Sequence, residues 1–299
     1  MASLGKILEK ITYRRLALLI VVVALIPILF PIGLPLPVDQ TTINFKKEID
    51  ILPKGSVVAF GVQITGAGAV PDAIDYLTDT SRYLAERGLK VLYVGFADVS
   101  PSTVQTAIQH SGVETKYGWK YGEDYVITPY LPGDEPAIAS FAAGVQTAVA
   151  ADYFGTSVDK LPLMKGLKTL NDFQLAISYY GSYTYVDMFA RQWATKYPSV
   201  PWIVIGILPT VAPYYPTLCR GVLDQARGMA EFEVIAGLPG VYAARTDARN
   251  TVGFTVVILL VASNIAYYKT FGFRKRAGLG FERAFFGKEE GSKEKGDGG

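Results

Sequence analysis

Acidic side chains that could do chemistry follow two apolar runs of the sequence. Asp98 comes directly after residues 90–97, and Asp134 and Glu135 come after residues 124–131. A pair of carboxylates can transfer protons as acid and base or can ligate a divalent cation. The same residue types also cap helices and occupy their first turns. We therefore predict no catalytic residue and no metal site from these acids, and keep an Asp98-dependent reaction as an alternative.

Cysteine and histidine chemistry is limited to one residue of each type. Cys219 and His110 are the single representatives in 299 residues. One cysteine cannot form an intrachain disulfide, and this pair falls short of the usual zinc ligand sets. Cys219 also lies in an apolar pattern, where a thiol is inert. No G-x-S-x-G nucleophile turn occurs.

A glycine-rich turn, TGAG at residues 65–68, follows the first apolar run of the central segment. Val70 and Pro71 come next, so the third glycine of the G-x-G-x-x-G fingerprint is missing. The Lys-Ser/Thr pair of a phosphate-binding P-loop is missing as well. We predict no nucleotide cofactor and no other cofactor.

Tyrosines gather after the apolar runs and give the clearest signal for binding. Tyrosine offers a rigid aromatic face and a hydroxyl, which suits protein interfaces and sugar-like ligands. Because side chains alternate along a strand, some of these tyrosines must enter the core, and ordinary half-buried tyrosines are the alternative. The predicted ligand or partner rim is Thr65, Gly66, Asp98, Tyr130, Tyr179, Tyr180, Tyr183, Tyr214 and Tyr215.

The elements that must position this rim lie in residues 57–236. Five apolar runs, each followed by a helical pattern, predict an α/β domain with a parallel sheet covered on both faces. The alternation resembles Rossmann-like folds, a likeness that carries no function. Ligands of such sheets bind at the carboxyl ends of the strands. The runs are residues 56–64, 90–97, 124–131, 173–180 and 201–208.

Residues 155–172 form an unusually long connection inside this domain. Loops of this length are uncommon in compact domains and are often functional. The segment carries four large apolar residues that need cover, so it is either a flap or partner contact, or a packed irregular connector.

Residues 216–233, PTLCRGVLDQARGMAEFE, are predicted as the last helix of the domain. Its charges fall at i,i+4 spacing and form a solvated rim, since such pairs contribute only about 0.2–0.5 kcal/mol. A glycine inside a helix costs about 1 kcal/mol relative to alanine, which indicates close approach by a neighbouring element or subunit. The predicted contact face of this helix is Gly221, Asp224, Gln225 and Gly228.

Two charge-free stretches predict membrane spans. Half of the chain is hydrophobic and its mean hydropathy is +0.24. Residues 16–38 and 250–268 are each long enough to cross a hydrocarbon core of about 30 Å. The first reads as an uncleaved anchor because no small-residue cleavage site follows it. Residues 39–56 and 237–249 are then linkers.

Positive charge predicts the orientation. Lys and Arg concentrate in residues 1–15, read as an interfacial amphipathic segment, and in residues 269–299, read as a basic disordered tail. Both termini are then cytoplasmic and the α/β domain is extracytoplasmic. Chain entry and exit are expected at the amino edge of the sheet, so that its carboxyl edge points away from the bilayer. A net charge of +2 without a basic patch argues against nucleic acid.

These observations favour a two-pass, membrane-anchored binding or scaffold protein over an enzyme. Its partners would be the lipid bilayer and either further copies of itself or another membrane protein. The first alternative is a receptor domain for a small solute at the carboxyl edge of the sheet. The second is a membrane-tethered hydrolase or transferase that uses Asp98.

Overall fold

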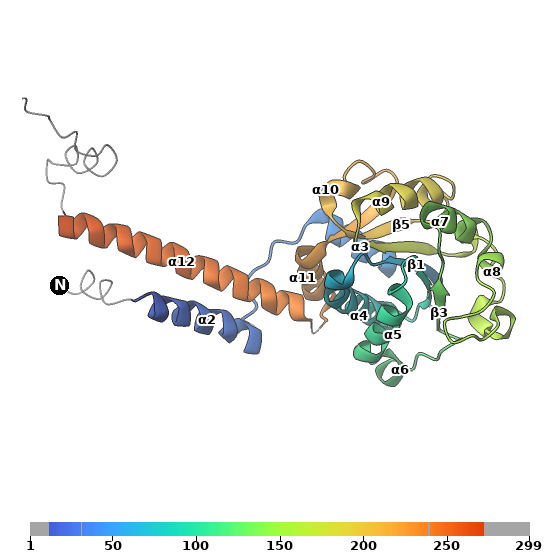
Figure 1. Ribbon diagram of the computed structural model, residues 1–299, viewed down its shortest axis with the longest axis horizontal. Helices are drawn as coiled ribbons and strands as arrows, with labels where there is room; N and C mark the ends of the chain where they lie inside the picture. Colours follow the sequence, from blue (N-terminus) through green and yellow to red (C-terminus); the bar gives the residue numbers. More distant parts are fainter. Residues whose placement is uncertain (1–11, 31, 239, 272–299) are drawn as a thin grey trace, which may run out of the picture. The chain divides into compact units, whose positions relative to one another are not determined.

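The computed structural model describes residues 12–30, 32–238 and 240–271 (Figure 1). The chain divides into two compact units. One is the domain of residues Phe30–Asp247, and the other consists of the terminal segments on either side of it. The predictions for residues 1–11 and 272–299 lie outside the described residues.

The domain is built on a six-stranded sheet in the order β3-β2-β1-β4-β5-β6, with every neighbouring pair parallel. This is the strand order of Rossmann folds. The five predicted strands are confirmed, and a sixth is added. The strands are Val57–Gln63 (β1), Lys90–Gly95 (β2), Tyr125–Tyr130 (β3), Leu175–Tyr180 (β4), Trp202–Gly206 (β5) and Cys219–Asp224 (β6).

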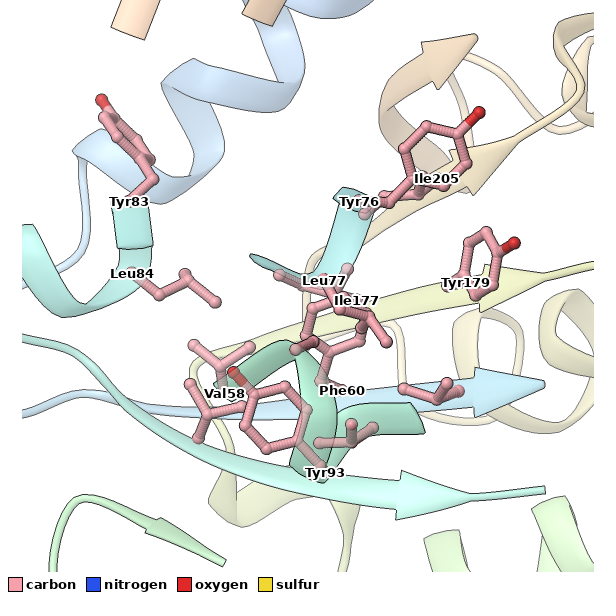
Figure 2. Packing of buried hydrophobic residues seen from close by; sticks show 14 of the residues in the cluster. Val58, Phe60, Tyr76, Leu77, Tyr83, Leu84, Tyr93, Ile177, Tyr179 and Ile205 are labelled. Carbon is pink, nitrogen blue, oxygen red and sulfur yellow. The ribbon is translucent and has the colours of Figure 1, made fainter. Parts of the chain in front are cut away.

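One face of the sheet is covered by four longer helices. Its core contains Phe60 of β1, Ile177 of β4 and Leu77 of the helix that follows β1 (Figure 2). Apolar residues on both faces of the central strands require this double cover. The helices on this face are Gln40–Asp50 (α3), Val70–Glu86 (α4), Ser100–Ser111 (α5) and Gln225–Ala236 (α11), with the short η1 (Ala67–Ala69) before α4 and α6 (Val113–Lys116) after α5.

The opposite face is covered by shorter helices and by the long connection (Figure 1). An aromatic cluster of Phe96, Phe141, Phe189 and Trp193 fills its centre with edge-to-face and tilted contacts. The elements are Asp134–Ala143 (α7), Val145–Ala148 (α8), Val158–Lys160 (η2), Pro162–Met164 (η3), Leu170–Asp172 (η4), Tyr183–Phe189 (α9), Ala190–Ala194 (η5) and Leu208–Val211 (α10).

The connection at residues 155–172 is a packed irregular connector, the second of the two interpretations given above. It consists largely of the three short turns η2, η3 and η4. Its four large apolar side chains, Leu161, Leu163, Met164 and Leu167, are all buried in the core of this face. Their cover comes from the domain itself.

The segment predicted as a linker at residues 39–56 belongs to the fold. Most of it is helix α3, whose Phe45 and Ile49 are fully buried. The helix lies against β6 and α11. The linker prediction is therefore wrong. The sequence of α3 is mostly polar, and its apolar face consists of only two large residues, Phe45 and Ile49.

The prediction of one helix over residues 216–233 is also wrong for the first half of this range. Cys219–Asp224 form β6, which pairs with β5 at the sheet edge. Gly221 therefore lies on a strand, and a Cβ there would stand 2.4 Å from the Cα and N of Phe45. Gly228 lies on α11, where a Cβ would stand 2.7 Å from the carbonyl carbon of Leu223. The two glycines admit neighbouring elements of the same chain and share no helix face.

The structure also describes helix α2 (Tyr13–Leu29) and helix α12 (Val241–Phe271), and α12 begins inside the domain and continues beyond Asp247. Among the described residues, one helical stretch, Val241–Ile265, is long and apolar enough to cross a membrane by length and composition. Helix α2 is apolar and ends at Leu29, and residues 32–39, before α3, have no regular structure. Residues 241–249, predicted as linker, are helical.

A carboxylate joins the incoming and outgoing segments at the border of the domain. Asp247 on α12 accepts hydrogen bonds from the backbone N–H groups of Ile32, Gly33 and Leu34 at 3.1, 2.8 and 3.1 Å. Gly33 has a φ of +67°, a conformation that lets successive N–H groups converge on one anion. Residues 32–34 and the first turns of α12 are thereby held together.

The outgoing segment does not leave from the amino edge of the sheet, so that expectation is wrong. Tyr242, in the first turn of α12, stacks on Tyr76 with ring centroids 5.1 Å apart. Its hydroxyl donates to Asp72 in the first turn of α4 at 3.2 Å. Because α4 begins where β1 ends, the chain leaves the domain beside the carboxyl edge.

Candidate functional site

The candidate site is a hollow at the carboxyl edge of the sheet, where the strand order reverses between β1 and β4. Open α/β sheets place ligands at this switch point, since the connections on either side diverge to opposite faces. The hollow has a volume of about 110 Å³. Its lining residues are Ala69, Asp72, Tyr76, Tyr179, Tyr180, Gly181, Gly206, Ile207 and Gln225.

Tyr179 is the most informative residue of the lining. It is 5% exposed, and within the described residues its hydroxyl has no hydrogen-bond partner. Its ring meets Tyr76 edge to face at 5.7 Å, and Figure 2 shows the two rings near the carboxyl ends of the strands. The hydroxyl oxygen is not among the described buried polar atoms that lack a partner, so it is open to water and to an occupant of the hollow.

Burial keeps these phenols neutral. Desolvation raises the pKa of Tyr76 to about 12, and it raises the pKa of Tyr179 beyond that of an ordinary phenol. A neutral phenol can donate one hydrogen bond and accept others. The hollow therefore offers hydrogen bonds without contributing phenolate charge at neutral pH.

Tyr180, the next residue of β4, turns to the opposite face of the sheet. Its hydroxyl shares a hydrogen bond of 2.8 Å with Thr210 Oγ1. Gly206, at the end of β5, lets this ring lie close, because a Cβ there would stand 2.5 Å from the ring. The Tyr180 ring is thereby fixed as a wall of the hollow.

The turns after β1 and β4 are clamped to each other. Gln63 accepts a hydrogen bond from the backbone N–H of Gly181 at 3.2 Å and donates one to Thr65 Oγ1 at 3.0 Å. A Cβ at Gly181 would stand 2.9 Å from the backbone nitrogen of Thr65. Thr65 and Gly66, both in the predicted rim, are exposed on this clamped turn.

The last wall of the hollow comes from the junction of β6 and α11. Asp224 accepts a hydrogen bond from the backbone N–H of Leu208 at 2.9 Å and so ties this junction to α10. Gln225 follows with a φ of +45°, a left-handed conformation that costs a residue with a side chain about 1–3 kcal/mol. Gln225 and Asp224, predicted as a helix contact face, thus sit at the carboxyl edge.

The acids predicted as a catalytic alternative are engaged separately. Asp134 accepts a hydrogen bond from Tyr185. Glu135 receives the Arg191 guanidinium at 2.9 and 2.8 Å and Gln192 at 2.7 Å, and this hydrogen bonding lowers its pKa to about 2. Asp98 is exposed and accepts from the N–H of Val99 at 2.9 Å. No described contact joins Asp98 to the other two.

The predicted tyrosine rim is divided among different surroundings. Tyr130 and Tyr183 are 39% and 64% exposed. Tyr214 donates to Asp187 at 2.6 Å, and Tyr215 accepts from Asn44 at 2.7 Å, so these half-buried rings are held inside the domain. Together with the buried Tyr179 and Tyr180, most of the rim is part of the fold.

Six lining residues of the hollow were not predicted from the sequence: Ala69, Asp72, Tyr76, Gly181, Gly206 and Ile207. Two signals could have found the glycines, Asp72 and Tyr76. Gly181 directly follows the apolar strand β4, and Gly206 is the last residue of the apolar strand β5. Asp72 and Tyr76 are spaced by four residues at the start of the helix that follows β1, so they share one helix face.

The single cysteine and histidine lie away from this hollow. Cys219 is buried on β6, where desolvation raises the pKa of its thiol to about 12, and its sulfur donates to the Gly221 carbonyl at 3.2 Å. His110 is exposed in the last turn of α5. Among the residues described, no three His, Cys, Asp or Glu side chains group as metal ligands.

Comparison with known proteins adds no assignment. No protein-family model matches the chain, and no curated protein or solved structure matches it either.

Proposed function

We propose that this protein is a membrane-anchored receptor domain that binds a small polar ligand in the hollow at the carboxyl edge of its sheet. The observation that carries the proposal is the hollow at the switch point, whose lining includes the largely buried Tyr179 with no described hydrogen bond to its hydroxyl. The small-solute alternative from the sequence is thereby favoured over assembly as the first function to test.

The size of the hollow limits its ligand. A water molecule in the liquid occupies about 30 Å³, so 110 Å³ corresponds to about four waters. Pockets for drug-sized ligands and cofactors measure about 300–1,000 Å³. The ligand is therefore a molecule of few non-hydrogen atoms, or a larger one that inserts a single group.

The lining indicates the charge of the ligand. The lining includes Asp72 and three tyrosines and no Lys or Arg, and Arg245 of α12 lies 4.0 Å from the Asp72 carboxylate. Arg245 offsets part of the Asp72 charge, so a neutral polar ligand fits this lining, and a small cation fits it better than an anion because the lining itself holds one acid and no base. Aromatic rings also attract ammonium groups. Small amines and small polyols are the two classes to test.

The anchor consists of α12 and, in the two-pass arrangement, of α2. The apolar side chains of both helices are largely exposed, which suits a lipid environment. We propose that both termini are cytoplasmic and that the domain is extracytoplasmic, on the basis of the Lys and Arg residues that flank the spans. Labelling of the domain in intact cells tests this topology, and protection from the label would contradict it.

The assembly role stays a prediction, and the hydrolase or transferase role is not favoured. Tyr130 and Tyr183 are the two rim tyrosines with substantial exposure, while the others support the fold. Asp98 has no described catalytic partner.

Thermal unfolding of the full chain in mild detergent tests the ligand proposal. Small alkylammonium ions and glycerol-sized polyols are added over a concentration series, and one class is expected to raise the melting temperature saturably. Tyr179→Phe removes only the hydroxyl and should abolish the response. Tyr93→Phe makes the same chemical change at a residue whose hydroxyl is paired with Ser81, and should retain it. An absent response, or an equal one in Tyr179→Phe, contradicts the proposal.

A further inference from the structure

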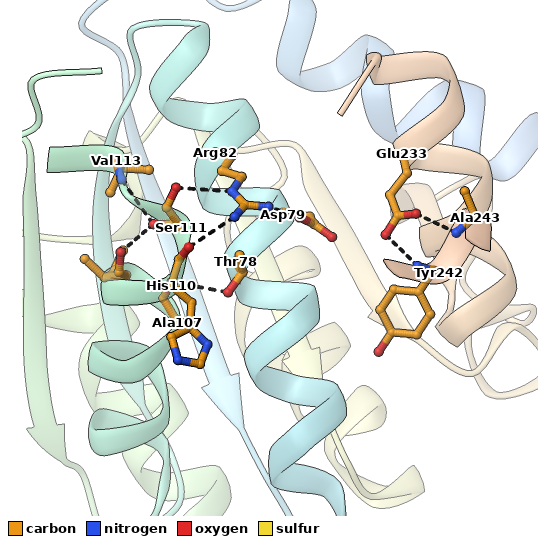
Figure 3. A network of polar contacts seen from close by, with 11 residues as sticks. Thr78, Asp79, Arg82, Ala107, His110, Ser111, Val113, Glu233, Tyr242 and Ala243 are labelled. Carbon is orange, nitrogen blue, oxygen red and sulfur yellow. Dashed lines mark hydrogen bonds and ion pairs between the residues drawn. The ribbon is translucent and has the colours of Figure 1, made fainter. Parts of the chain in front are cut away.

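Two buried acids, Asp79 and Glu233, lie on the neighbouring helices α4 and α11 where the domain passes into α12, and the side chain of Asp79 is directed toward Glu233 (Figure 3). Asp79 on α4 is 3% exposed and Glu233 on α11 is 1% exposed. The Glu233 carboxylate accepts hydrogen bonds from the backbone N–H groups of Tyr242 at 3.0 Å and Ala243 at 2.6 Å (Figure 3). These are among the first N–H groups of α12, which have no partner within the helix. Glu233 therefore caps the helix that carries the apolar span.

The chain is shaped to place the cap. A Cβ at Gly240 would stand 1.9 Å from the carboxyl carbon of Glu233. The backbone thus bends closely around this carboxylate before α12 begins. A side chain at position 240 would displace the Glu233 carboxylate from its present position, so glycine here permits the contact between Glu233 and the start of α12.

We propose that Asp79 and Glu233 form a clasp that holds the first turn of α12 on the domain while the pair shares a proton, and that weakens when both are ionised. Two adjacent buried carboxylates cannot both ionise cheaply, because each charge loses hydration and repels the other. A proton on Asp79 leaves Glu233 negative and able to cap α12. When that proton is lost, the repulsion between the two carboxylates is relieved if Glu233 moves away, and this movement breaks its hydrogen bonds to Tyr242 and Ala243.

The surrounding charges act in opposite directions. On α4, Arg82 pairs with Asp79 at 3.0 Å and favours its ionisation, whereas Asp75 opposes the ionisation of Glu233. Arg245 on α12 pairs with Asp75 at 3.3 Å. Helix α5 contributes backbone carbonyls of His110 and Ser111, which accept from Arg82. On α3, Lys46 and Asp50 engage Tyr83, one turn beyond Asp79. Helix α11, which also packs against α4, contributes Glu233 itself.

Burial and the negative charge of Glu233 raise the pKa of Asp79 to about 7, and burial also raises that of Glu233. An acid whose pKa is raised on folding binds more protons folded than unfolded at intermediate pH. Stability from this pair is therefore fully present below about pH 4 and is lost as the pH rises to about 7.

Amide hydrogen exchange of residues 240–247 tests the clasp in the full chain in detergent. After correction for the intrinsic exchange rate at each pH, protection of the Tyr242 and Ala243 amides should fall at least about tenfold, one pKa unit of linkage, between about pH 5.5 and about pH 8.5. Protection that does not change with pH in the wild type overturns the proposal, whatever the variants do.

Three variants separate the clasp from a general effect of pH. Asp79→Asn cannot ionise and should keep the amides protected throughout this range. Glu233→Gln replaces the carboxylate cap and should lower protection at every pH. Glu86→Gln, an exposed acid on the same helix, should behave as wild type. An unchanged midpoint in folded Asp79→Asn contradicts the proposal. If that variant does not fold, wild-type urea stability that fails to decrease between about pH 4 and about pH 7 contradicts it.

Discussion

Replacing Gly221 with alanine tests how β6 and α3 are joined. The added Cβ would stand 2.4 Å from both the Cα and N of Phe45 and 2.9 Å from the carbonyl carbon of Asn44. Ordinary carbon contacts begin near about 3.5 Å, so about 1 Å of displacement is needed. The obstacle is backbone, which cannot rotate away, and α3 must therefore move off the sheet.

Two limits bracket the cost. If α3 shifts and stays packed, the strain resembles overpacking of a core, about 1–3 kcal/mol. If α3 detaches, the fully buried side chains of Phe45 and Ile49 lose their cover, at about 1.5–3 kcal/mol each, or about 3–6 kcal/mol together. The upper limit is a large part of the about 5–15 kcal/mol that stabilises a typical domain.

Urea unfolding in mild detergent measures the effect. Gly68→Ala is the matched control, because that glycine has open space around its Cβ position and no positive φ. The double variant Phe45→Ala/Gly221→Ala should not regain stability over Phe45→Ala, since the clash is with backbone. An unfolding midpoint for Gly221→Ala equal to wild type, or rescue by truncating the Phe45 ring, would refute the reasoning.

Three further changes have defined outcomes. Asp247→Ala removes the acceptor of three backbone N–H groups and should cost about 2 kcal/mol or more while exposing residues 30–38 to protease; Asp247→Asn, which keeps one acceptor oxygen, should cost less. Cys219, whose pKa burial raises to about 12, should resist thiol reagents at about pH 8 until the domain is unfolded, and labelling of the folded protein would contradict its burial. Gly228→Leu places a side chain against the backbone of Leu223 and should lower the melting temperature, whereas an unchanged value would show that α11 can move aside.

The α/β class and five strands could be predicted because buried parallel strands leave a continuous apolar signature. The strands that contain Val58 and Ile203 are covered by helices on both faces of the sheet, so nearly every position of these strands is buried and apolar. The sixth strand was not predicted because it lies at the edge of the sheet, where a charged residue such as Arg220 can remain exposed and interrupts the apolar pattern. Its charges then matched helical spacing by coincidence. Helix α3 was not predicted because only two large apolar residues, Phe45 and Ile49, pack it against the domain, and its remaining sequence is largely polar.

The position of the candidate site in the fold was predicted, but only some of its residues were. Parallel strands bring their carboxyl ends to one edge whatever their order, so Tyr179 and Tyr180 could be assigned to that edge. Which of them faces the hollow depends on the order of the strands and on α4, which supplies Asp72 and Tyr76. The acids Asp98 and Glu135 were grouped by position after strands, while their actual partners come from other helices.

The sequence by itself determined the properties that depend on local pattern: a parallel α/β domain, apolar segments at both ends, and a glycine-rich turn without a nucleotide fingerprint. Only the tertiary structure decided that Gly221 and Gly228 admit α3 and the end of β6, that Glu233 caps α12, and that the Tyr179 hydroxyl has no described hydrogen bond. The reason is physical. Hydrophobic periodicity reports how a segment faces its surroundings, whereas a clasp or a hollow depends on contacts between residues far apart in the chain, which a local pattern does not encode.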